Sequence, residues 1–164
     1  MAGPPLSAAE IEFLRALVKL RVRFMIVGLS AAALQGAPVV TQDIDLWFED
    51  LNDSRFREAI RETGAAYVPP SQLNPPMFVG KGVELFDIVL TMHGLGEFSE
   101  ELKNCIDVRL DNVRVKVLSL ERIVHSKRAA NRPKDRLVLP VLTDAIAVAE
   151  AIKKKSVGKK RKKL

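Results

Sequence analysis

Two aspartates in an otherwise apolar run are the residues of this chain best suited to metal chemistry. Asp43 and Asp45 alternate with Ile44, Leu46 and Phe48. Successive side chains of a β-strand point to opposite faces, so both carboxylates are expected on one face of a strand. Two ionised carboxylates in a partly buried groove are unfavourable by on the order of several kcal/mol unless a positive group joins them. Oxygen ligands suit magnesium or manganese, so the pair is predicted to form a metal site.

A third aspartate and a glycine occupy comparable positions in other predicted strands. Asp87 lies within the apolar run 83–90, which the sequence predicts to be a strand. Gly28 ends the short apolar run 24–27, which is predicted to be a buried strand. An alanine-rich helix is expected over residues 30–35, so Gly28 stands where a strand turns into a helix.

The remaining elements must hold these residues together. Ser7 and Glu10 have the spacing of a capping box, which predicts a first helix over residues 8–21. Further helices are expected from Asn52 or Asp53 through Arg61 and over residues 98–105, 120–130 and 134–152. Hairpins are expected between 77–79 and 83–90 and between 106–110 and 113–118. Interleaved helices and strands with a hairpin predict an α/β or α+β fold with a mixed sheet.

The overall composition narrows the class of protein. With 164 residues, 48% of them hydrophobic, the chain can bury one sizeable core, and no apolar run approaches the roughly 20 residues that span a bilayer. A single cysteine, Cys105, and two histidines exclude a disulfide framework and make a His/Cys zinc site implausible. The first nine residues lack the features of a secretory signal. A cytoplasmic protein without a membrane segment is therefore predicted.

The basic charge of the chain is concentrated at its end. The net charge is +6, but residues 153–164 contribute +8, so residues 1–152 carry 18 basic and 20 acidic side chains. The expected organisation is one domain over residues 1–152 and a basic, disordered tail over residues 153–164. Such a tail is expected to bind polyanions, RNA among them, with strong salt dependence, or to act only as a solubilising segment.

Taken together, three segments resemble the DNA polymerase β-like nucleotidyltransferase superfamily. They are residues 27–31 (VGLSA), 41–46 (TQDIDL) and 85–88 (LFDI). The superfamily pattern has a glycine at a helix start, an Asp-x-Asp pair further on and a third aspartate on a later strand. Residues 118–135 are similar to the C-terminal helices of small bacterial nucleotidyltransferase-like proteins, including toxin–antitoxin members. The resemblance implies a nucleotidyltransferase fold, with a mixed central sheet flanked by helices and with C-terminal helices.

The resemblance also implies a role for each aspartate. Asp43 and Asp45 would hold two Mg²⁺ ions, and Asp87 would complete one of the two sites. The substrate would be a nucleoside triphosphate, with ATP expected. Asp87 would also be the natural proton acceptor for an attacking hydroxyl, unless a metal-bound water serves.

Further residues are implied to bind the phosphates. Gly28 would allow close approach of the backbone to the nucleotide, and Ser30 would add a hydroxyl donor or cap the helix. Three basic residues would neutralise the pyrophosphate or form a solvated helix face: Lys127, Arg132 and Lys134. The sequence departs from the superfamily pattern at Leu29, where glycine or serine is usual.

These observations leave three functional hypotheses. The first is Mg²⁺-dependent transfer of a nucleoside monophosphate to a hydroxyl of a protein, an RNA or a small molecule. The second is a catalytically silent module that binds nucleic acid or a cognate toxin or antitoxin, which Leu29 favours. The third is an antibiotic-type adenylyltransferase, for which Glu49, Asp50 and Glu84 would have to form an acidic pocket for a cationic acceptor.

Overall fold

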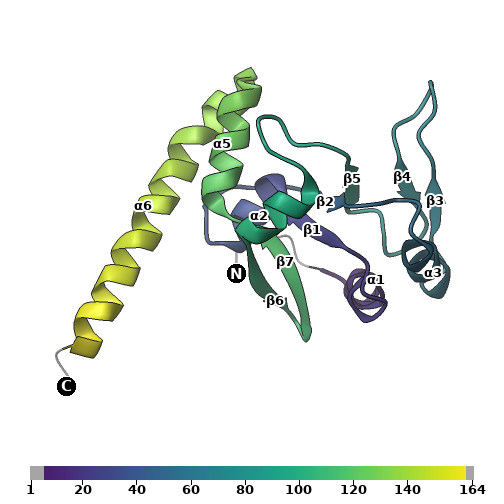
Figure 1. The fold of residues 1–164 in the computed structure, drawn as a ribbon, viewed down its shortest axis with the longest axis horizontal. Helices are drawn as coiled ribbons and strands as arrows, with labels where there is room; N and C mark the ends of the chain where they lie inside the picture. Colours follow the sequence, from purple (N-terminus) through teal and green to yellow (C-terminus); the bar gives the residue numbers. More distant parts are fainter. Residues whose placement is uncertain (1–5, 162–164) are drawn as a thin grey trace.

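A mixed five-stranded sheet forms the centre of the computed structural model, which describes residues 6–161 (Figure 1). Its strands are β1 (Phe24–Val27), β2 (Ile44–Phe48), β5 (Phe86–Val89), β6 (Cys105–Leu110) and β7 (Val113–Leu118). Their order across the sheet is β5-β2-β1-β7-β6. Strand β1 runs antiparallel to β2 and parallel to β7, whereas β2 and β5 are parallel. The predicted mixed α/β architecture is therefore confirmed.

Helices flank this sheet on both sides. They are α1 (Ala8–Lys19), α2 (Gly28–Leu34), α3 (Ser54–Glu62), α4 (Phe98–Glu101), the 3₁₀ turn η1 (Leu102–Asn104), α5 (Leu120–Ala130) and α6 (Pro133–Arg161). Helix α1 packs against α3, and α2 packs against α5, which in turn packs against α6. No helix among residues 6–161 is both long enough and apolar enough to cross a membrane.

Aromatic side chains fill the core between the sheet and the pair α1 and α3. Phe13 of α1 contacts Phe86 with ring centroids 5.2 Å apart, and Phe48 of β2 contacts Phe56 of α3 at 5.0 Å. Phe48 shares its strand face with Ile44 and Leu46, as the alternation in β2 predicts. The intervening residues of β2 must therefore point to the opposite face, toward α2.

The capping box at the start of the chain is present as predicted. The Ser7 hydroxyl accepts a hydrogen bond from the Glu10 backbone N–H, and the Glu10 carboxylate accepts one from the Ser7 backbone N–H. Asp53 caps α3 by accepting from the Arg55 backbone N–H at 2.8 Å. Both caps satisfy N–H groups that have no partner within the helix.

One predicted hairpin is wrong and the other is confirmed. Strand β4 (Met77–Val79) pairs with β3 (Ala66–Val68), which the sequence did not predict, and the two form a separate small sheet. Strand β5 pairs instead with β2, in parallel, because its alternating Phe86 and Ile88 continue the buried face of the central sheet. The second hairpin, β6 with β7, turns at Asp111, whose φ is +53°.

The C-terminal helices also differ from the prediction. Asn131 adopts a left-handed conformation (φ +48°) that ends α5, and α6 begins two residues later at Pro133. Helix α6 continues through Arg161, where the sequence predicts a disordered tail from residue 153. Lysine and arginine are good helix formers, and the Ser156 hydroxyl donates to the Lys153 carbonyl within the helix. Residues 162–164 of the predicted tail lie outside the described residues.

Candidate active site

The three predicted aspartates line one cavity of about 300 Å³ beside the parallel strands β2 and β5. This acidic cavity is lined by Leu29, Thr41, Asp43, Asp45, Asp87, Lys127, Lys134, Asp135 and Val138. Its residues come from the start of α2, the segment before β2, strands β2 and β5, and helices α5 and α6. Segments far apart in the sequence thus converge on one cavity.

Strand register brings Asp45 and Asp87 together. They are direct partners on the parallel strands β2 and β5, so their side chains leave the same face of the sheet. The pKa of the Asp45 carboxyl is raised to about 6, first by burial and then by the negative charge of Asp87. Burial also raises the pKa of Asp87, with a further contribution from Asp43. The cavity therefore concentrates negative charge that a cation would stabilise.

Gly28 is required by the position of Asp45. A Cβ at residue 28 would lie 2.4 Å from Oδ2 of Asp45, and the φ of Gly28 is +65°, which side-chain-bearing residues rarely adopt. Strands β1 and β2 bring the two chain segments together, since Val27 is the register partner of Asp45. The glycine therefore makes room for a carboxylate of the cavity, in addition to any approach of a ligand.

Ser30 positions Asp45 instead of facing the cavity. Its side chain is almost fully buried, its hydroxyl donates to the Val27 carbonyl at 2.8 Å, and it accepts from the Asp45 backbone N–H at 3.2 Å. With both contacts made inside the protein, the hydroxyl is not directed at a ligand in the cavity. The expectation that Ser30 donates to a phosphate is corrected in this respect, and its role is to fix the start of α2 against β2.

The predicted basic residues divide into two groups. Lys127 and Lys134 line the acidic cavity, and their charges oppose the rise in the pKa of Asp45. Arg132 does not line the cavity, because its guanidinium binds the carboxylate of Asp135 with Nε 2.7 Å from Oδ2. The structure thus places Arg132 outside the cavity lining, at the N-terminal turn of α6, and its binding of the pyrophosphate stays a prediction.

Sequence reasoning missed Asp135, which organises the basic side of the cavity. Its side chain is fully buried and also binds Lys127, with Nζ 3.1 Å from Oδ1. The hydrogen bond from Arg132, supported by Lys127, holds the pKa of Asp135 well below its usual range. The spacing of Arg132 and Asp135 in the first turn of a helix was the only available signal. Asp135 thus ties Lys127 of α5 to α6 beside the three other aspartates.

Replacing Asp135 with asparagine is expected to lower the free energy of unfolding at pH 7 by about 2 to 4 kcal/mol, because Lys127 would lose its anionic partner. A lowered pKa in the folded state means that this stabilisation is present above about pH 4 and is lost as the pH falls further. Urea denaturation at pH 7 and pH 3 measures both effects. The control is Asp107→Asn, whose pair with Lys116 is about half exposed and is expected to contribute less than about 1 kcal/mol. An equal loss in the two variants would contradict the structural role of Asp135.

The carboxylates of the acidic cavity fit Mg²⁺ that binds together with a triphosphate. Among residues 6–161 there is no group of three or more His, Cys, Asp or Glu side chains that could by itself hold a metal ion. Mg²⁺ in nucleotide-dependent enzymes commonly binds through one or two carboxylates, with water and substrate phosphates completing its shell. Asp45 and Asp87, with Asp43 beside them, offer carboxylates of this kind. The residues therefore fit a metal that arrives with a triphosphate.

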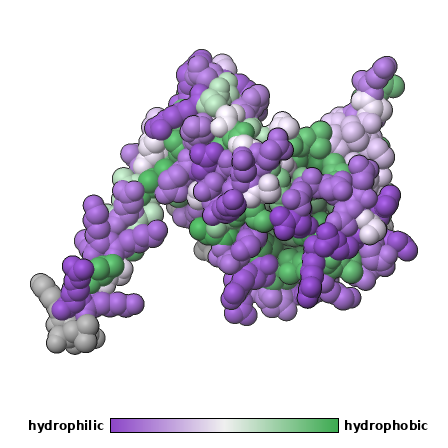
Figure 2. Space-filling model, viewed as in Figure 1, coloured by the Kyte–Doolittle hydropathy of each residue, from purple (hydrophilic) through white to green (hydrophobic). Residues whose placement is uncertain are grey.

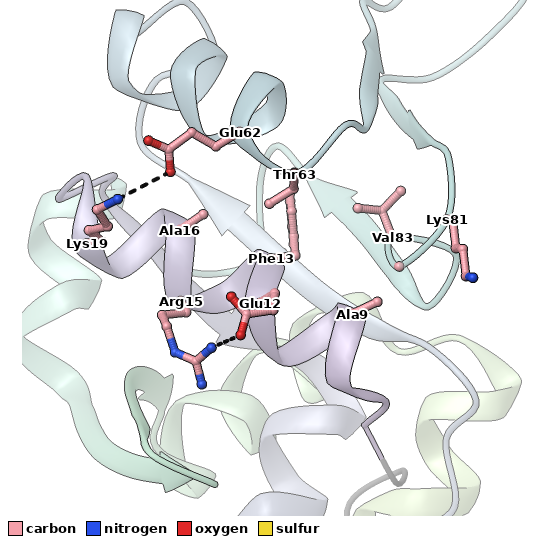
Figure 3. Close-up of a pocket in the computed structure, with 11 residues that line it drawn as sticks. Ala9, Glu12, Phe13, Arg15, Ala16, Lys19, Glu62, Thr63, Lys81 and Val83 are labelled. Carbon is pink, nitrogen blue, oxygen red and sulfur yellow. Dashed lines mark hydrogen bonds and ion pairs between the residues drawn. The ribbon is translucent and has the colours of Figure 1, made fainter.

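A larger cavity of about 470 Å³ lies between α1, the end of α3 and the turn before β5 (Figure 3). Its carboxylates already have basic partners, since Glu12 pairs with Arg15, and Glu62 pairs with Lys19 at 3.7 Å. No aspartate of the acidic cavity takes part. Because both of its carboxylates are paired with basic side chains, this larger cavity lacks the unpaired carboxylates that metal chemistry needs.

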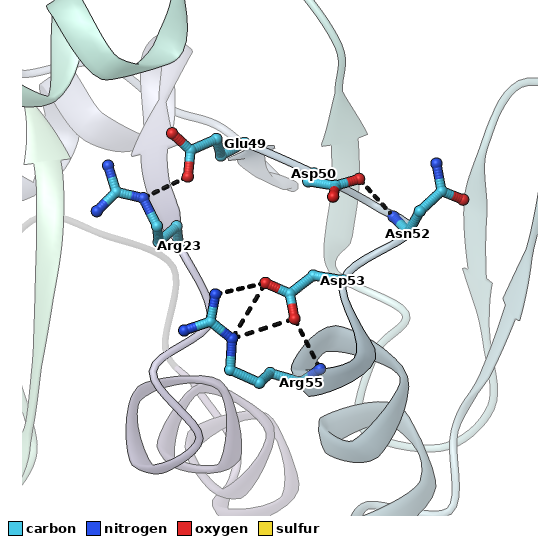
Figure 4. Close-up of polar contacts among 6 residues, drawn as sticks. All are labelled: Arg23, Glu49, Asp50, Asn52, Asp53 and Arg55. Carbon is cyan, nitrogen blue, oxygen red and sulfur yellow. Dashed lines mark hydrogen bonds and ion pairs between the residues drawn. The ribbon is translucent and has the colours of Figure 1, made fainter.

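The acidic pocket required by the antibiotic-type hypothesis is not formed by the residues considered for it. Glu49 and Asp50 follow β2 at the end opposite Asp43, where Glu49 pairs with Arg23 and Asp50 accepts from the Asn52 backbone N–H (Figure 4). Glu84 accepts from the Gly82 backbone N–H at 2.7 Å. None of these three carboxylates lines the acidic cavity. A cationic acceptor would have to be held by other groups.

No protein-family model and no curated protein matches this chain, but solved structures share its fold. A crystal structure of ANT(2″)-Ia in complex with adenylyl-2″-tobramycin matches with a TM-score of 0.57 and 16% identity, over 92% of this chain and 95% of that one. A solution structure of the antibiotic-resistance factor ANT(2″)-Ia gives 0.56 and 15%, over 93% of each chain.

A third match is described as a nucleotidyltransferase-like protein. The crystal structure of an antigenic nucleotidyltransferase-like protein from Paracoccidioides brasiliensis has a TM-score of 0.56 and 18% identity, over 88% of this chain and 79% of that one. These similarities show that the chain has the nucleotidyltransferase fold, which confirms the fold implied by its motifs. They give no support to the narrower resemblance to toxin–antitoxin members.

Proposed function

We propose that this protein is a Mg²⁺-dependent nucleotidyltransferase that transfers a nucleoside monophosphate from a nucleoside triphosphate to an acceptor hydroxyl. One observation carries the proposal: Asp43, Asp45 and Asp87 line one cavity together with Lys127 and Lys134, in a chain with the nucleotidyltransferase fold. Carboxylates for a metal and cations for phosphates are the two requirements of phosphoryl transfer. ATP is the proposed donor, as the neighbouring complex with an adenylylated product suggests.

The aspartates are proposed to hold two Mg²⁺ ions together with the triphosphate. Asp43 and Asp45 would hold the two ions, and Asp87 would complete one of the two sites. When bound, the metal would polarise the α-phosphate and lower the pKa of the attacking hydroxyl. The raised pKa of Asp45 supports this assignment, because burial and the charge of Asp87 outweigh the opposing charges of Lys127 and Lys134 and leave a carboxylate that a bound cation would stabilise.

The lysines are proposed to bind the phosphates that leave. Lys127 is largely buried, with 16% of its side chain exposed, and is held in place by Asp135, whereas Lys134 is exposed at the rim. A held cation that needs no reorganisation stabilises developing charge more effectively than a mobile one. Lys127 is therefore the proposed main contact of the pyrophosphate, and Lys134 its auxiliary.

The proposed reaction forms a bond between the acceptor oxygen and the α-phosphorus and breaks the bond from the α-phosphorus to the bridging oxygen. Pyrophosphate carries away the electron pair of the broken bond. The proton of the acceptor hydroxyl passes to Asp87 or to solvent. Asp87 suits this role because it is the exposed member of the Asp45–Asp87 pair and its pKa is raised.

The test is transfer of label from triphosphates that carry ³²P at the α-position. The protein is incubated with each of the four triphosphates, Mg²⁺ and an acceptor from one of three classes: RNA, a protein extract or an aminoglycoside. Label in an acceptor together with release of pyrophosphate is the expected result. Label that appears equally with EDTA present, or with Asp43→Asn/Asp45→Asn, would refute the assignment.

A silent module is the second candidate, and the position of Leu29 favours it. Leu29 lines the acidic cavity, where it reduces the space for phosphates and offers no hydroxyl. If this residue has silenced the site, Leu29→Ser should gain Mg²⁺-dependent triphosphate binding that the natural chain lacks. Binding by the natural chain that is unchanged in Leu29→Ser would refute the silent-module hypothesis. Calorimetry on both proteins measures the difference.

A further inference from the structure

The end of α6 is a strongly basic helix that no other part of the described chain covers. Residues 153–161 carry six cationic side chains and no acidic one, and every residue from 151 to 161 is exposed. The helix projects from the body of the protein (Figure 1), and hydrophilic side chains dominate its projecting end on the face seen in Figure 2. With residues 1–152 nearly neutral, this positive charge is not compensated elsewhere.

One side of this helix is shaped to receive an anion. A shallow depression of about 370 Å³ is lined by Lys153, Lys154, Val157, Gly158 and Arg161, which we call the basic face. Their spacing places them on one side of the helix. Gly158 has no side chain to fill the depression, and a Cβ at this position would meet nothing within 4 Å. Lys155, Lys159 and Lys160 do not line the depression.

The chemistry of this segment favours a polyanion over a membrane. Helices that bind in a membrane interface need one continuous apolar side. Among residues 152–161, by contrast, basic side chains lie all around the helix, and the large apolar side chains are Ile152 and Val157. The segment contains no aromatic residue, so it has no means of stacking bases. Phosphate groups repeated along a backbone match a row of lysines and arginine without requiring base contacts.

We propose that the basic face binds the phosphodiester backbone of a nucleic acid whose terminal hydroxyl is the acceptor in the acidic cavity. The acceptor part of this inference rests on the proposed function. Lys134 lines the cavity in the first turn of α6, and the basic face starts 19 residues later and ends at Arg161. At 1.5 Å per residue the two sites are about 28 to 40 Å apart along the helix. That span corresponds to roughly 8 to 12 base pairs at about 3.4 Å each.

Binding is tested without nucleotide, on the full chain, by fluorescence anisotropy with a labelled RNA hairpin and a DNA hairpin of the same sequence. The stem has 14 base pairs, long enough to exceed the estimated span. Lys153→Ala/Lys154→Ala/Arg161→Ala removes three charges from the basic face. Lys155→Ala/Lys159→Ala/Lys160→Ala removes three charges outside it and is the matched control. Circular dichroism verifies that α6 remains helical in both variants.

The basic-face variant is expected to bind at least about tenfold more weakly at 150 mM salt, and its slope of log affinity against log salt is expected to fall by about 2 to 3. The control variant should lose less of both. Equal losses in the two variants, or no binding by the natural chain, would overturn the surface assignment. Tighter binding to anionic vesicles or to polyglutamate than to either hairpin would overturn it in favour of a membrane or an acidic protein.

Transfer of α-³²P label to hairpins with stems of 5 and 14 base pairs tests the acceptor. The long stem is expected to be labelled at least about tenfold faster, because only it can reach both sites along the helix. The advantage should disappear in the basic-face variant. If Mg²⁺-dependent triphosphate binding is intact but neither hairpin is labelled, the acceptor assignment fails and the proposed function stands. If triphosphate binding is absent while hairpin binding persists, the proposed function fails and the surface stands.

Discussion

Asp45→Asn is expected to weaken Mg²⁺-dependent triphosphate binding by at least about 100-fold, since even residues that only support a metal ligand commonly contribute 10- to 100-fold. The same variant is expected to be more stable than the natural protein in the absence of ligand. Its amide has no charge to bury beside Asp87, whereas the raised pKa of Asp45, about 6, reflects an unfavourable ionised form. The expected gain is roughly 2 to 3 kcal/mol at pH 7.

The way in which the stability gain of Asp45→Asn changes with pH shows whether the gain comes from removing the buried charge of Asp45 or from a general stabilisation. The folded-state pKa of Asp45 is above its unfolded value, so ionisation of Asp45 lowers the stability of the natural protein as the pH rises from about 4 through 6. The advantage of Asp45→Asn should therefore grow over that range and be absent near pH 4. Calorimetric titration measures binding, and urea denaturation measures stability at each pH. A variant that binds triphosphate normally, or that is less stable at pH 7, would contradict the role of Asp45.

Gly28→Ala is expected to reduce both stability and triphosphate binding. The new methyl group would lie 2.4 Å from the Asp45 carboxylate, so the carboxylate or the start of α2 must move. The left-handed backbone at φ +65° adds about 1 to 2 kcal/mol for a residue with a side chain. A total loss of at least about 2 kcal/mol is expected, together with weaker binding, because Asp45 no longer holds its position beside Asp87.

Gly64→Ala is the matched control for this substitution. Gly64 has nearly the same backbone angle, φ +69°, but a Cβ there would meet nothing within 4 Å. It should show only the backbone effect of about 1 to 2 kcal/mol and leave triphosphate binding unchanged. Thermal denaturation and calorimetry of both variants give the comparison. If Gly28→Ala and Gly64→Ala are destabilised equally and Gly28→Ala still binds triphosphate normally, the close approach of residue 28 to Asp45 does not matter for binding.

The acidic side of the site was accessible from the sequence because it depends on strand periodicity. Asp45 lies on β2 and Asp87 on β5, and the period-two pattern of each run places both carboxylates on one face of the sheet. Asp43 was expected on the same strand, but β2 begins at Ile44, so Asp43 reaches the cavity from the segment just before the strand. The predicted fold class, which also depends on strand periodicity, was confirmed. The site residues as a functional set remain a prediction, which the experiments on Asp45 and Gly28 address.

The basic side was less accessible because it depends on how α5 and α6 pack. Lys127, Arg132 and Lys134 look equivalent as sequence, yet Asp135 binds Arg132 outside the cavity and holds Lys127 at its edge. The buried carboxylate of Asp135 in α6 therefore determines which of these basic residues lines the cavity, by binding Lys127 of α5 and Arg132. The periodicity of neither helix predicts these contacts. Ser30 is a similar case, since its partners Val27 and Asp45 meet only when β1 and β2 pair.

Strand pairing was predictable only where a tight turn specified it. The turn at Asp111 and Asn112 fixes the β6–β7 hairpin through local geometry. The glycine-rich connection between β4 and β5 carries a similar signal, but β5 pairs with β2 because burial of Phe86 against Phe13 and alignment with Ile44 outweigh a local hairpin. Long-range pairing of this kind depends on the whole core, which the sequence of one segment does not contain.

The most direct test of the proposed site is calorimetric titration of the natural chain with ATP in Mg²⁺ and again in EDTA. The proposal predicts saturable binding in Mg²⁺ that is lost in EDTA and in Asp43→Asn/Asp45→Asn, while Asp107→Asn behaves as the natural chain. Binding that does not depend on the metal or on these aspartates would contradict a nucleotidyltransferase site at the acidic cavity. Absence of binding by all four triphosphates would contradict it equally and would leave the chain a nucleotidyltransferase fold without a working triphosphate site.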